Sequence, residues 1–432
     1  MFSFLGEMSS PDGAPVPFAP PLSCPCCRFL SEGDIFLPPI YNPYADRERQ
    51  DVDIRTEMSS PQVALQLIRD AAFAMEAASG FDLEEREDRV LLVDTHGHAQ
   101  LEREGQVEYS IPQGTIRGGE VPGVVSLACA VSESDWHQTL SYARRSVRVL
   151  PGLGIHPWYL ENVSPNYLVE LERLLILHPN AVVGEIGLCK VARFVRSYPE
   201  GKPAAMELQR RVFREQFELA AKLVRPVTVH CVQQHGVIMN ILKDIRENRL
   251  EELKAARRSR WERENDLPEG KGQDPQNSDK GCAGNSFGNL LDAFPPAVGM
   301  HSFTGTAHHV KDILKFEESL FTGKFEEPGS SEDRNKKRPP IFYFGFSHSV
   351  NVLMCSSDKS QRQGKEAIQA VPLDRLLAES DVHSSNDTAA GTAGSVSYLS
   401  FALGKPLLET AEITANNGMK FLCSATSRMK PQ

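Results

Sequence analysis

Histidines and carboxylates of the kind that bind metal ions recur in this 432-residue chain at the ends of short apolar runs. Neutral imidazoles and carboxylates are ordinary ligands of divalent first-row metals. His96 and His98 close the first run, Glu185 lies in the fourth, His230 in the fifth, His301 in the sixth and Asp381 in the eighth. Because residues i and i+2 of a strand point to the same face, His96 and His98 can face one site. These groups predict a metal site wherever the ends of the runs meet.

The apolar runs themselves predict the strands of a barrel. They cover residues 90–98, 123–131, 148–156, 181–188, 226–232, 297–303, 341–347 and 376–382. Most are rich in Val, Ile, Leu or Phe without strict alternation, as expected for parallel strands covered on both faces. Helical patterns separate several of them, at 164–178, 203–224, 236–258, 307–320 and 363–370. The alternation predicts an α/β fold, a (β/α)8 TIM barrel, whose active site would lie at the carboxyl ends of the strands.

The chain before the barrel has a different composition. Residues 1–60 are rich in proline and are expected to form a disordered tail. Cys24, Cys26 and Cys27 fall in this tail, but they lack a second pair of ligands, so we do not assign zinc to them. Residues 61–90 are expected to hold a helix over 61–80 and a lead-in to the barrel.

The barrel domain is expected over residues 91–425, with long insertions near 257–294 and 324–340. Both insertions are polar or charged, which is typical of surface segments within loops. A Ser/Thr/Gly/Ala-rich stretch at 384–394 also suggests a loop. Basic patches at 254–263 and 334–338 could meet a polyanion, although charge runs of this kind are usually solvated.

The net charge of −10 argues against a broad surface for duplex DNA, though not against a local cleft. Nine scattered cysteines, an odd number, predict reduced thiols and a cytoplasmic or nuclear location. Neither a signal peptide nor a transmembrane helix is expected from the pattern of apolar residues.

The ordered motifs resemble the TatD family of metal-dependent hydrolases and deoxyribonucleases, which are amidohydrolase-like barrels. The matching stretches are VDTHGH (93–98), GIHPWY (154–159), VGEIGL (183–188), PVTVH (226–230), HSFTG (301–305), ESD (379–381) and TAEITANNGMKFL (410–422). The resemblance covers roughly Leu91 to Leu422. It extends to fungal members described as interactors of an anaphase-promoting-complex subunit.

The resemblance implies two divalent metal ions, with Mg, Mn and Zn not distinguished by this ligand set. One ion would be held by His96, His98, Glu185 and Asp381, and the second by Glu185, His230 and His301. Asp381 would act as general base on a water, and Glu185 would bridge the ions. His156 would contact the substrate or its phosphate, with a structural role as the alternative. Glu379 would support the site by hydrogen bonding, and Gln216 would pack.

The sequence departs from the family around the substrate. His230 is followed by Cys-Val-Gln-Gln, where the family commonly carries an arginine, and Asp381 is followed by Val-His383, where a proline is usual. A missing cation removes a natural phosphate partner. The main prediction is a metal-dependent phosphodiesterase or deoxyribonuclease that acts on DNA ends or single-stranded DNA.

Two alternatives stay open at this point. One is an amidohydrolase or esterase of the same fold that cleaves a small molecule or an acyl adduct. The other is a protein that binds a partner through its tail or insertions while retaining the metal site. No membrane partner is expected.

Overall fold

The computed structural model describes residues 58–79, 90–101, 123–265, 289–321 and 339–425. Its centre is an eight-stranded parallel sheet whose hydrogen-bonded order follows the sequence from β1 to β8. The strands are β1 (Val90–Gly97), β2 (Gly123–Cys129), β3 (Val149–Leu153), β4 (Val182–Cys189), β5 (Val227–Val232), β6 (Val298–Met300), β7 (Phe342–Ser347) and β8 (Leu376–Glu379). Each predicted apolar run overlaps one of them, which confirms the predicted barrel.

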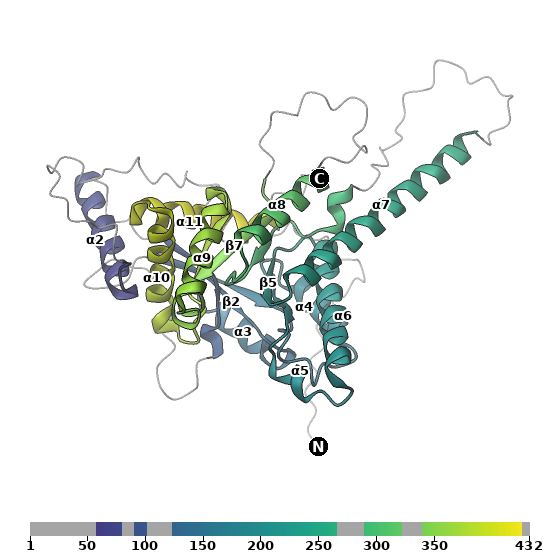
Figure 1. Ribbon diagram of the computed structural model, residues 1–432, viewed down its shortest axis with the longest axis horizontal. Coiled ribbons are helices and arrows are strands. Elements are labelled where there is room, and N and C mark those ends of the chain that lie inside the picture. The colour runs from purple at the N-terminus through teal and green to yellow at the C-terminus, as the bar shows by residue number, and fades with distance from the viewer. Residues whose placement is uncertain (1–57, 80–89, 102–122, 266–288, 322–338, 426–432) are drawn as a thin grey trace, which may run out of the picture.

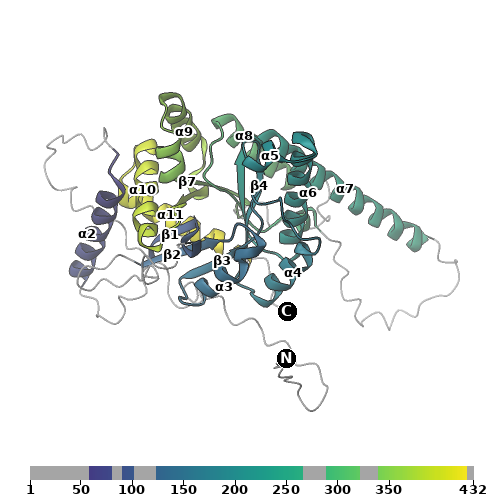
Figure 2. The same cartoon turned by 90° about the horizontal axis from the view of Figure 1, so that it is seen from below.

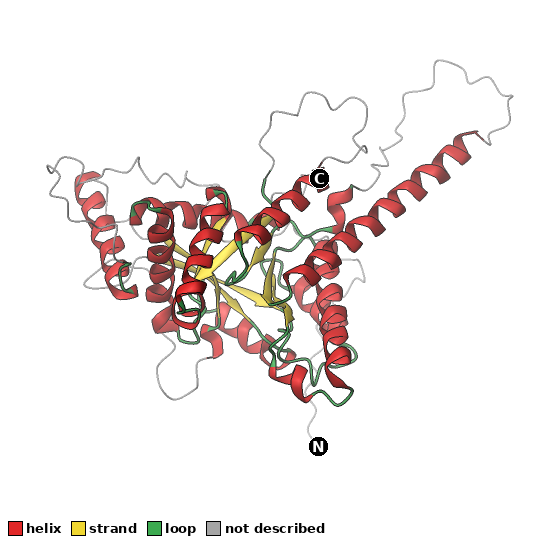
Figure 3. Cartoon of the chain, in the orientation of Figure 1, coloured by secondary structure: helices red, strands yellow, loops and turns green. Residues whose placement is uncertain are grey.

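Helices surround the strands (Figure 3). They are α2 (Pro61–Ser79), α3 (Trp136–Ala143), α4 (Tyr167–Leu177), α5 (Arg193–Ser197), α6 (Gly201–Lys222), α7 (His235–Asn265), α8 (Ala307–Phe321), α9 (Asp358–Ala370), α10 (Ser385–Leu403) and α11 (Leu407–Leu422). A π-helical segment, η6 (His348–Met354), follows β7, and the short 3-10 segment η4 (Leu290–Ala293) precedes β6. Within the described residues, no helix is both long and apolar enough to cross a membrane.

Hydrogen bonds of Asp94 and of the backbone cross the seam between β1 and β8. The carboxylate of this β1 residue accepts from the backbone N–H of Ser380 (2.8 Å) and from its hydroxyl (2.6 Å). Just beyond, the N–H of Asp381 donates to the carbonyl of His96 (3.0 Å). The seam therefore brings the first and last strands' polar residues together at the carboxyl end of the barrel.

The opposite end of the barrel is filled by α11. Its Phe421 is fully buried and packs edge-to-face on Tyr343 of β7, with ring centroids 5.7 Å apart. Gly299 of β6 allows this approach, because a Cβ there would lie only 3.0 Å from the tip of the Phe421 ring. The barrel interior is thus a packed core rather than a channel.

The stretch at 384–394 corrects one expectation, because it belongs to helix α10 and is not a loop. Thr388 and Thr392 donate hydrogen bonds to carbonyls one turn earlier, at Ser384 (3.2 Å) and Thr388 (2.7 Å). Small side chains let α10 pack closely on both sides: a Cβ at Gly394 would lie 2.8 Å from Pro61 of α2. Close packing between α2 and the barrel overrides the weak helix propensity of this composition. Figures 1 and 2 show α2 alongside α10.

The insertion after α7 also begins differently from the expectation. The predicted helix over 236–258 runs on to Asn265, into the segment assigned to a loop. Arg and Glu supply four of the seven residues at 259–265 and are good helix formers. Just before them, Lys254 pairs with Glu251 one turn earlier at 2.7 Å. The predicted helix at 61–80 is confirmed as α2. The expected tail with its cysteine cluster and most of the insertion at 324–340 lie outside the described residues.

Candidate metal centre

Seven polar side chains singled out from the sequence meet at the carboxyl end of the barrel. They are His96 from β1, His98 directly after β1, His156 after β3, Glu185 from β4, His230 from β5, His301 after β6 and Asp381 after β8. Parallel strands deliver them to one edge, which is where βα loops build active sites. Nearly all of them are buried, and His230 and Asp381 are partly exposed.

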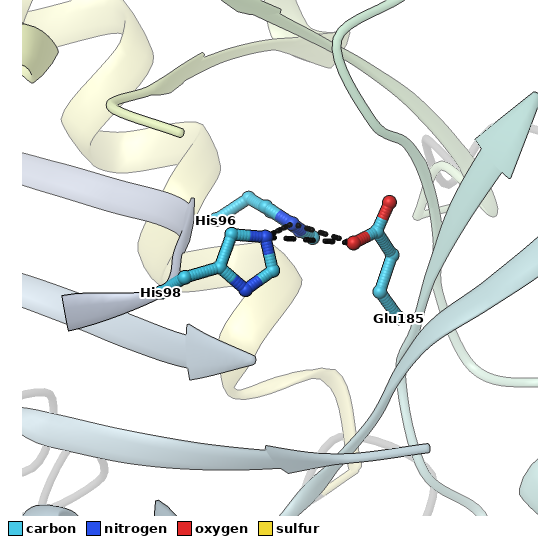
Figure 4. Close-up of side chains that lie close together, drawn as sticks. All are labelled: His96, His98 and Glu185. Carbon is cyan, nitrogen blue, oxygen red and sulfur yellow. Dashed lines mark hydrogen bonds and ion pairs between the residues drawn. The ribbon is translucent and has the colours of Figure 1, made fainter. Parts of the chain in front are cut away.

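Glu185 lies at the centre of this cluster, and its Oε2 atom faces His96 and His98. Its Oε2 lies 3.3 Å from Nε2 of His96 and 3.6 Å from Nε2 of His98 (Figure 4). The two histidine Nε2 atoms are themselves 3.3 Å apart. The i and i+2 spacing therefore places both imidazoles on one carboxylate oxygen.

The other oxygen of Glu185, Oε1, faces a different group of histidines. Its Oε1 lies 2.8 Å from Nδ1 of His230, 3.4 Å from Nε2 of His156 and 3.7 Å from Nε2 of His301. A carboxylate whose two oxygens face separate groups of ligands is suited to bridge two cations.

Asp381 lies across the same space. Its Oδ1 is 3.7 Å from Nε2 of His98 and its Oδ2 is 3.5 Å from Nε2 of His301. The residue has a left-handed backbone (φ 50°), which Asp tolerates better than most residues. This turn, together with the hydrogen bond to the carbonyl of His96, aims the carboxylate back over the barrel mouth.

The outer nitrogens of three histidines are tied to the barrel. Nδ1 of His96 lies 3.0 Å from Oγ1 of Thr228, Nδ1 of His98 lies 2.8 Å from the carbonyl of Cys129, and Nδ1 of His301 lies 3.1 Å from Oε2 of Glu379. Such contacts set the ring orientation and the tautomer. In each ring they leave Nε2 facing the centre.

Glu379 has the supporting contacts predicted for it. Besides His301, its Oε2 accepts the backbone N–H of Ser302 at 2.8 Å. Gly345 of β7 makes room for this side chain, because a Cβ there would lie 1.8 Å from Oε1 of Glu379. Burial raises the pKa of Glu379. The contact between Glu379 and His301 therefore needs a glycine at 345, and the buried carboxyl group of Glu379 needs hydrogen-bond donors.

The electrostatics of the cluster favour added positive charge. Burial alone would raise the pKa of Glu185, but His156, His96 and His301 hold it well below its ordinary value. Burial lowers the pKa of His96 to about 3. For His301, burial lowers the pKa, yet Asp381, Glu379 and Glu185 outweigh it and raise the value to about 10. Buried carboxylates thus recruit protons onto histidine, and a bound cation would take the place of those protons.

The donors present fit a divalent metal ion. Three groups have ligand atoms within 4.8 Å of one another: His96, His98 and Glu185; His96, His301 and Asp381; and His156, Glu185 and His230. In the last group, the nitrogen of His230 that lies beside the carboxylate is Nδ1, 2.8 Å from Oε1 of Glu185. Imidazole nitrogens and carboxylate oxygens gathered in this way are the donors that a divalent first-row metal ion accepts.

The grouping differs in two details from the one that the resemblance implies. His301 lies with His96 and Asp381, in addition to its longer contact with Glu185. His156, expected to contact substrate, lies close enough to Glu185 and His230 to act as a ligand. His383, which follows Asp381, is exposed, with its ring centroid 5.2 Å from that of His98.

Two glutamines of α6 support the site. Gln216, for which packing was expected, accepts the backbone N–H of Ile155 at 2.8 Å. Gln209, which the sequence reasoning missed, donates to the carbonyl of Pro157 (3.0 Å) and accepts the N–H of Cys189 (3.0 Å). Both amides are buried and hold the loop that carries His156. Their spacing of seven residues, which places both on one helix face, was the available signal.

Comparisons with known sequences relate the chain to one family. A family model described as TatD related DNase matches residues 93–422. The chain is similar to Cut9-interacting protein scn1 of Schizosaccharomyces pombe, with 25% identity over 328 residues, covering 64% of this chain and 84% of the relative.

Three solved structures are similar to the chain at low identity. YJJV, a TatD homolog from Escherichia coli K12, has a TM-score of 0.44 and 18% identity, covering 69% of this chain and 85% of its own. A TatD family hydrolase from Entamoeba histolytica has a TM-score of 0.46 and 13% identity, covering 76% and 97%. An uncharacterized amidohydrolase from Saccharomyces cerevisiae has a TM-score of 0.43 and 13% identity, covering 76% and 99%.

Proposed function

The chain belongs to the TatD related DNase family, and we propose that it is a metal-dependent hydrolase that cleaves phosphodiester bonds at DNA ends or in single-stranded DNA. The observation that carries this proposal is the geometry of Glu185. Its two oxygens face separate groups of histidines, with Asp381 beside both groups at the carboxyl end of the barrel.

We assign one divalent ion to His96, His98, Glu185 and Asp381, and a second to Glu185, His230 and His301. The first set is supported by the distances of His96 and His98 from Glu185 and of His98 from Asp381. The second is supported by the distances of His230 and His301 from Glu185, and His156 is an additional donor beside it. When bound, two ions supply Lewis-acid activation of a water and neutralise charge on the scissile phosphate. Mg, Mn and Zn all accept such nitrogen and oxygen ligands.

Asp381 is the proposed general base. Its side chain is 13% exposed, against 3% for Glu185 and 2% for Glu379, so it is the site carboxylate that an incoming substrate reaches most easily. Burial would raise its pKa, but His301, His96 and His98 outweigh burial and lower it. Asp381 therefore stays ionised at neutral pH and can accept the proton of an attacking water. We assign to His156 a contact with the substrate or its phosphate.

A hydrolysis screen tests the proposal. The metal-loaded protein is offered a single-stranded oligodeoxynucleotide, the matching duplex and p-nitrophenyl acetate, in separate reactions with Mg, Mn or Zn. We expect nucleotide release from the single strand that is lost with EDTA and in Asp381→Asn. Turnover of the acyl ester with no cleavage of either DNA would overturn the proposal in favour of the esterase alternative.

A second candidate function, binding of a protein partner, is favoured by two observations. The relative from Schizosaccharomyces pombe is named for its interaction with Cut9. In this chain, α7 projects beyond the barrel (Figure 1). The last part of α7 in contact with the barrel lies near Arg249, because its guanidinium contacts Asn289 and Asp292, which precede β6 in the chain. Leu253 is buried, and the side chains described after it, including Lys254 and Arg258, are exposed.

We therefore propose that the projecting part of α7, from Lys254 onward, contacts an acidic surface of a Cut9-like partner. The test is the affinity of purified Cut9 for this chain and for its Lys254→Glu/Arg258→Glu variant, measured by calorimetry. Binding that weakens at least about fivefold in the variant, a coupling of about 1 kcal/mol, supports the proposal. Binding that is absent, or equal in both proteins, contradicts it.

The described cysteines bear on location. Cys129, Cys189, Cys231 and Cys355 have free thiols. Free thiols are typical of reducing compartments, and they support the proposed cytoplasmic or nuclear location.

A further inference from the structure

Two large aromatic side chains stand half-exposed beside the metal centre. Trp158 is 49% exposed and Tyr159 is 50% exposed, directly after His156 and Pro157 in the loop that follows β3. By contrast, Trp136, on the barrel's outer side, is only 2% exposed. An exposed indole next to a site of concentrated buried charge is a large flat apolar surface that water covers in the free protein.

The indole of Trp158 is held in place and is not a loose surface side chain. Its Nε1–H donates to Sγ of Cys189 at the end of β4, 3.1 Å away. Its backbone N–H donates to Nδ1 of His156 at 3.2 Å. One edge of the ring and its backbone are therefore fixed to the barrel, which lowers the entropy cost of binding a ligand against the exposed part.

Both aromatic rings lie close to the metal-site histidines. The Trp158 ring centroid is 5.5 Å from that of His156 and 6.4 Å from that of His230. The Tyr159 ring centroid is 6.0 Å from that of His156. A group bound on this surface would thus lie beside the proposed metal centre, next to the reacting bond.

We propose that Trp158 and Tyr159 form an aromatic subsite that stacks against a nucleobase adjacent to the scissile phosphate. This inference rests on the proposed function and deepens it, because it selects unpaired bases: in a duplex the base faces are already stacked. The loop after His230 reads Cys-Val-Gln-Gln and offers no cation to a phosphate. Stacking, worth about 1–3 kcal/mol per base, would supply affinity that such a cation gives elsewhere.

The first test separates binding from turnover. Trp158→Ala should raise KM for a single-stranded oligodeoxynucleotide by about 5- to 150-fold while kcat changes little, because stacking contributes mainly to binding. Trp158→Phe, which keeps a flat ring, should recover much of the affinity. Trp261→Ala is the matched control, because Trp261 is 67% exposed but lies near the far end of α7.

An abasic substrate sharpens the test. The wild-type protein should lose affinity for an oligonucleotide whose base beside the cleaved bond is replaced by an abasic residue. The Trp158→Ala variant should bind both substrates alike, since the stacking partner is already gone. Equal KM values for wild type and Trp158→Ala, or equal sensitivity of both proteins to the missing base, would overturn the subsite.

A binding measurement distinguishes failure of the subsite from failure of the proposed function. In a Trp261→Phe background, thymidine 5′-monophosphate should quench tryptophan fluorescence, whereas ribose 5-phosphate should not, and Trp158→Phe should abolish the quenching. If no oligonucleotide is hydrolysed, the nuclease proposal fails, and this quenching alone decides for or against the aromatic subsite.

Discussion

The two ends of the barrel use the same chain in different ways. At the carboxyl end, buried histidines and carboxylates from strands far apart in sequence gather around Glu185, in groups whose ligand atoms lie within 4.8 Å of one another. At the amino end, α7 continues past the barrel (Figure 2), with exposed charges after Leu253, and the buried Phe421 fills the interior. Residues at the first end depend on each other's positions, and those along the projecting helix do not. Substitutions at the carboxyl end should therefore affect chemistry, whereas substitutions of exposed residues along the projecting helix should leave both chemistry and stability unchanged.

The largest effect is expected from replacing His96 and His98 together. His96→Ala/His98→Ala removes two imidazoles from one oxygen of Glu185. Bound metal should fall well below the wild-type amount and turnover should be lost, while the barrel stays folded, because residues at the mouth serve function more than stability. Metal analysis and circular dichroism measure both. The exposed His308→Ala is the control, and full metal content in the double variant would refute the ligand assignment.

Asp381→Asn should have the next largest effect. The substitution keeps the shape and one oxygen near the site, but it removes the proton acceptor. We expect kcat to fall by about 10²- to 10⁴-fold at saturating metal, the usual range for a lost general base. Asp387→Asn, the same change at an exposed position of α10, should leave kcat unaltered. Retention of more than about a tenth of wild-type turnover would mean that another group activates the water.

Glu379→Gln should weaken the site without destroying it. Glu379 contacts the outer nitrogen of His301 and the N–H of Ser302. Loss of such a supporting carboxylate typically reduces metal affinity by about 10- to 100-fold. Calorimetric titration with Zn or Mn measures the change, and Glu318→Gln, at an exposed position of α8, is the matched control. Equal affinities in the two variants would show that His301 needs no partner.

His235 makes stability at the carboxyl end depend on pH. Burial lowers its pKa from 6.5 to about 4. The unfolded chain therefore takes up a proton at a higher pH than the folded chain, so this stability is full above pH 6.5 and is lost as the pH falls toward 4. When the pH is lowered from about 7 to about 5, the unfolding free energy of wild type should therefore decrease by about 2 kcal/mol more than that of His235→Gln.

Urea unfolding at the two pH values measures this difference. His308→Gln, on the exposed surface of the neighbouring α8, should follow wild type. Identical pH dependence in the His235 variant and in wild type would exclude a neutral buried histidine at this position.

The smallest effect is expected at the amino end. Lys254→Glu/Arg258→Glu reverses two exposed charges on α7 and breaks one exposed pair, between Lys254 and Glu251. Exposed pairs contribute little, so the unfolding free energy should stay within about 0.5 kcal/mol and kcat should not change. A marked decrease in the unfolding free energy or in kcat would show that the two ends of the barrel are coupled.

Much of this architecture was readable from local patterns. Strands buried on both faces must be nearly continuous in apolar residues, so each run could be recognised by itself. Because the carboxyl ends of parallel strands share one edge, a His or carboxylate at the end of a run could be placed near the others without knowing any distance. That reasoning correctly predicted that Glu185, His230 and Asp381 would meet, although they lie far apart in the sequence.

Other features depended on contacts that no local pattern encodes. The small residues of α10 form a helix because α2 and the barrel pack against both of its sides. The contact between Trp158 and Cys189 joins two loops that the sequence separates by thirty-one positions. Likewise, which oxygen of Glu185 faces which histidine depends on the twist and closure of the whole sheet. The sequence by itself determined which residues reach the mouth, because strand direction is a local property. Only the tertiary structure decided how they pair there, because pairing depends on distances between separate strands and loops.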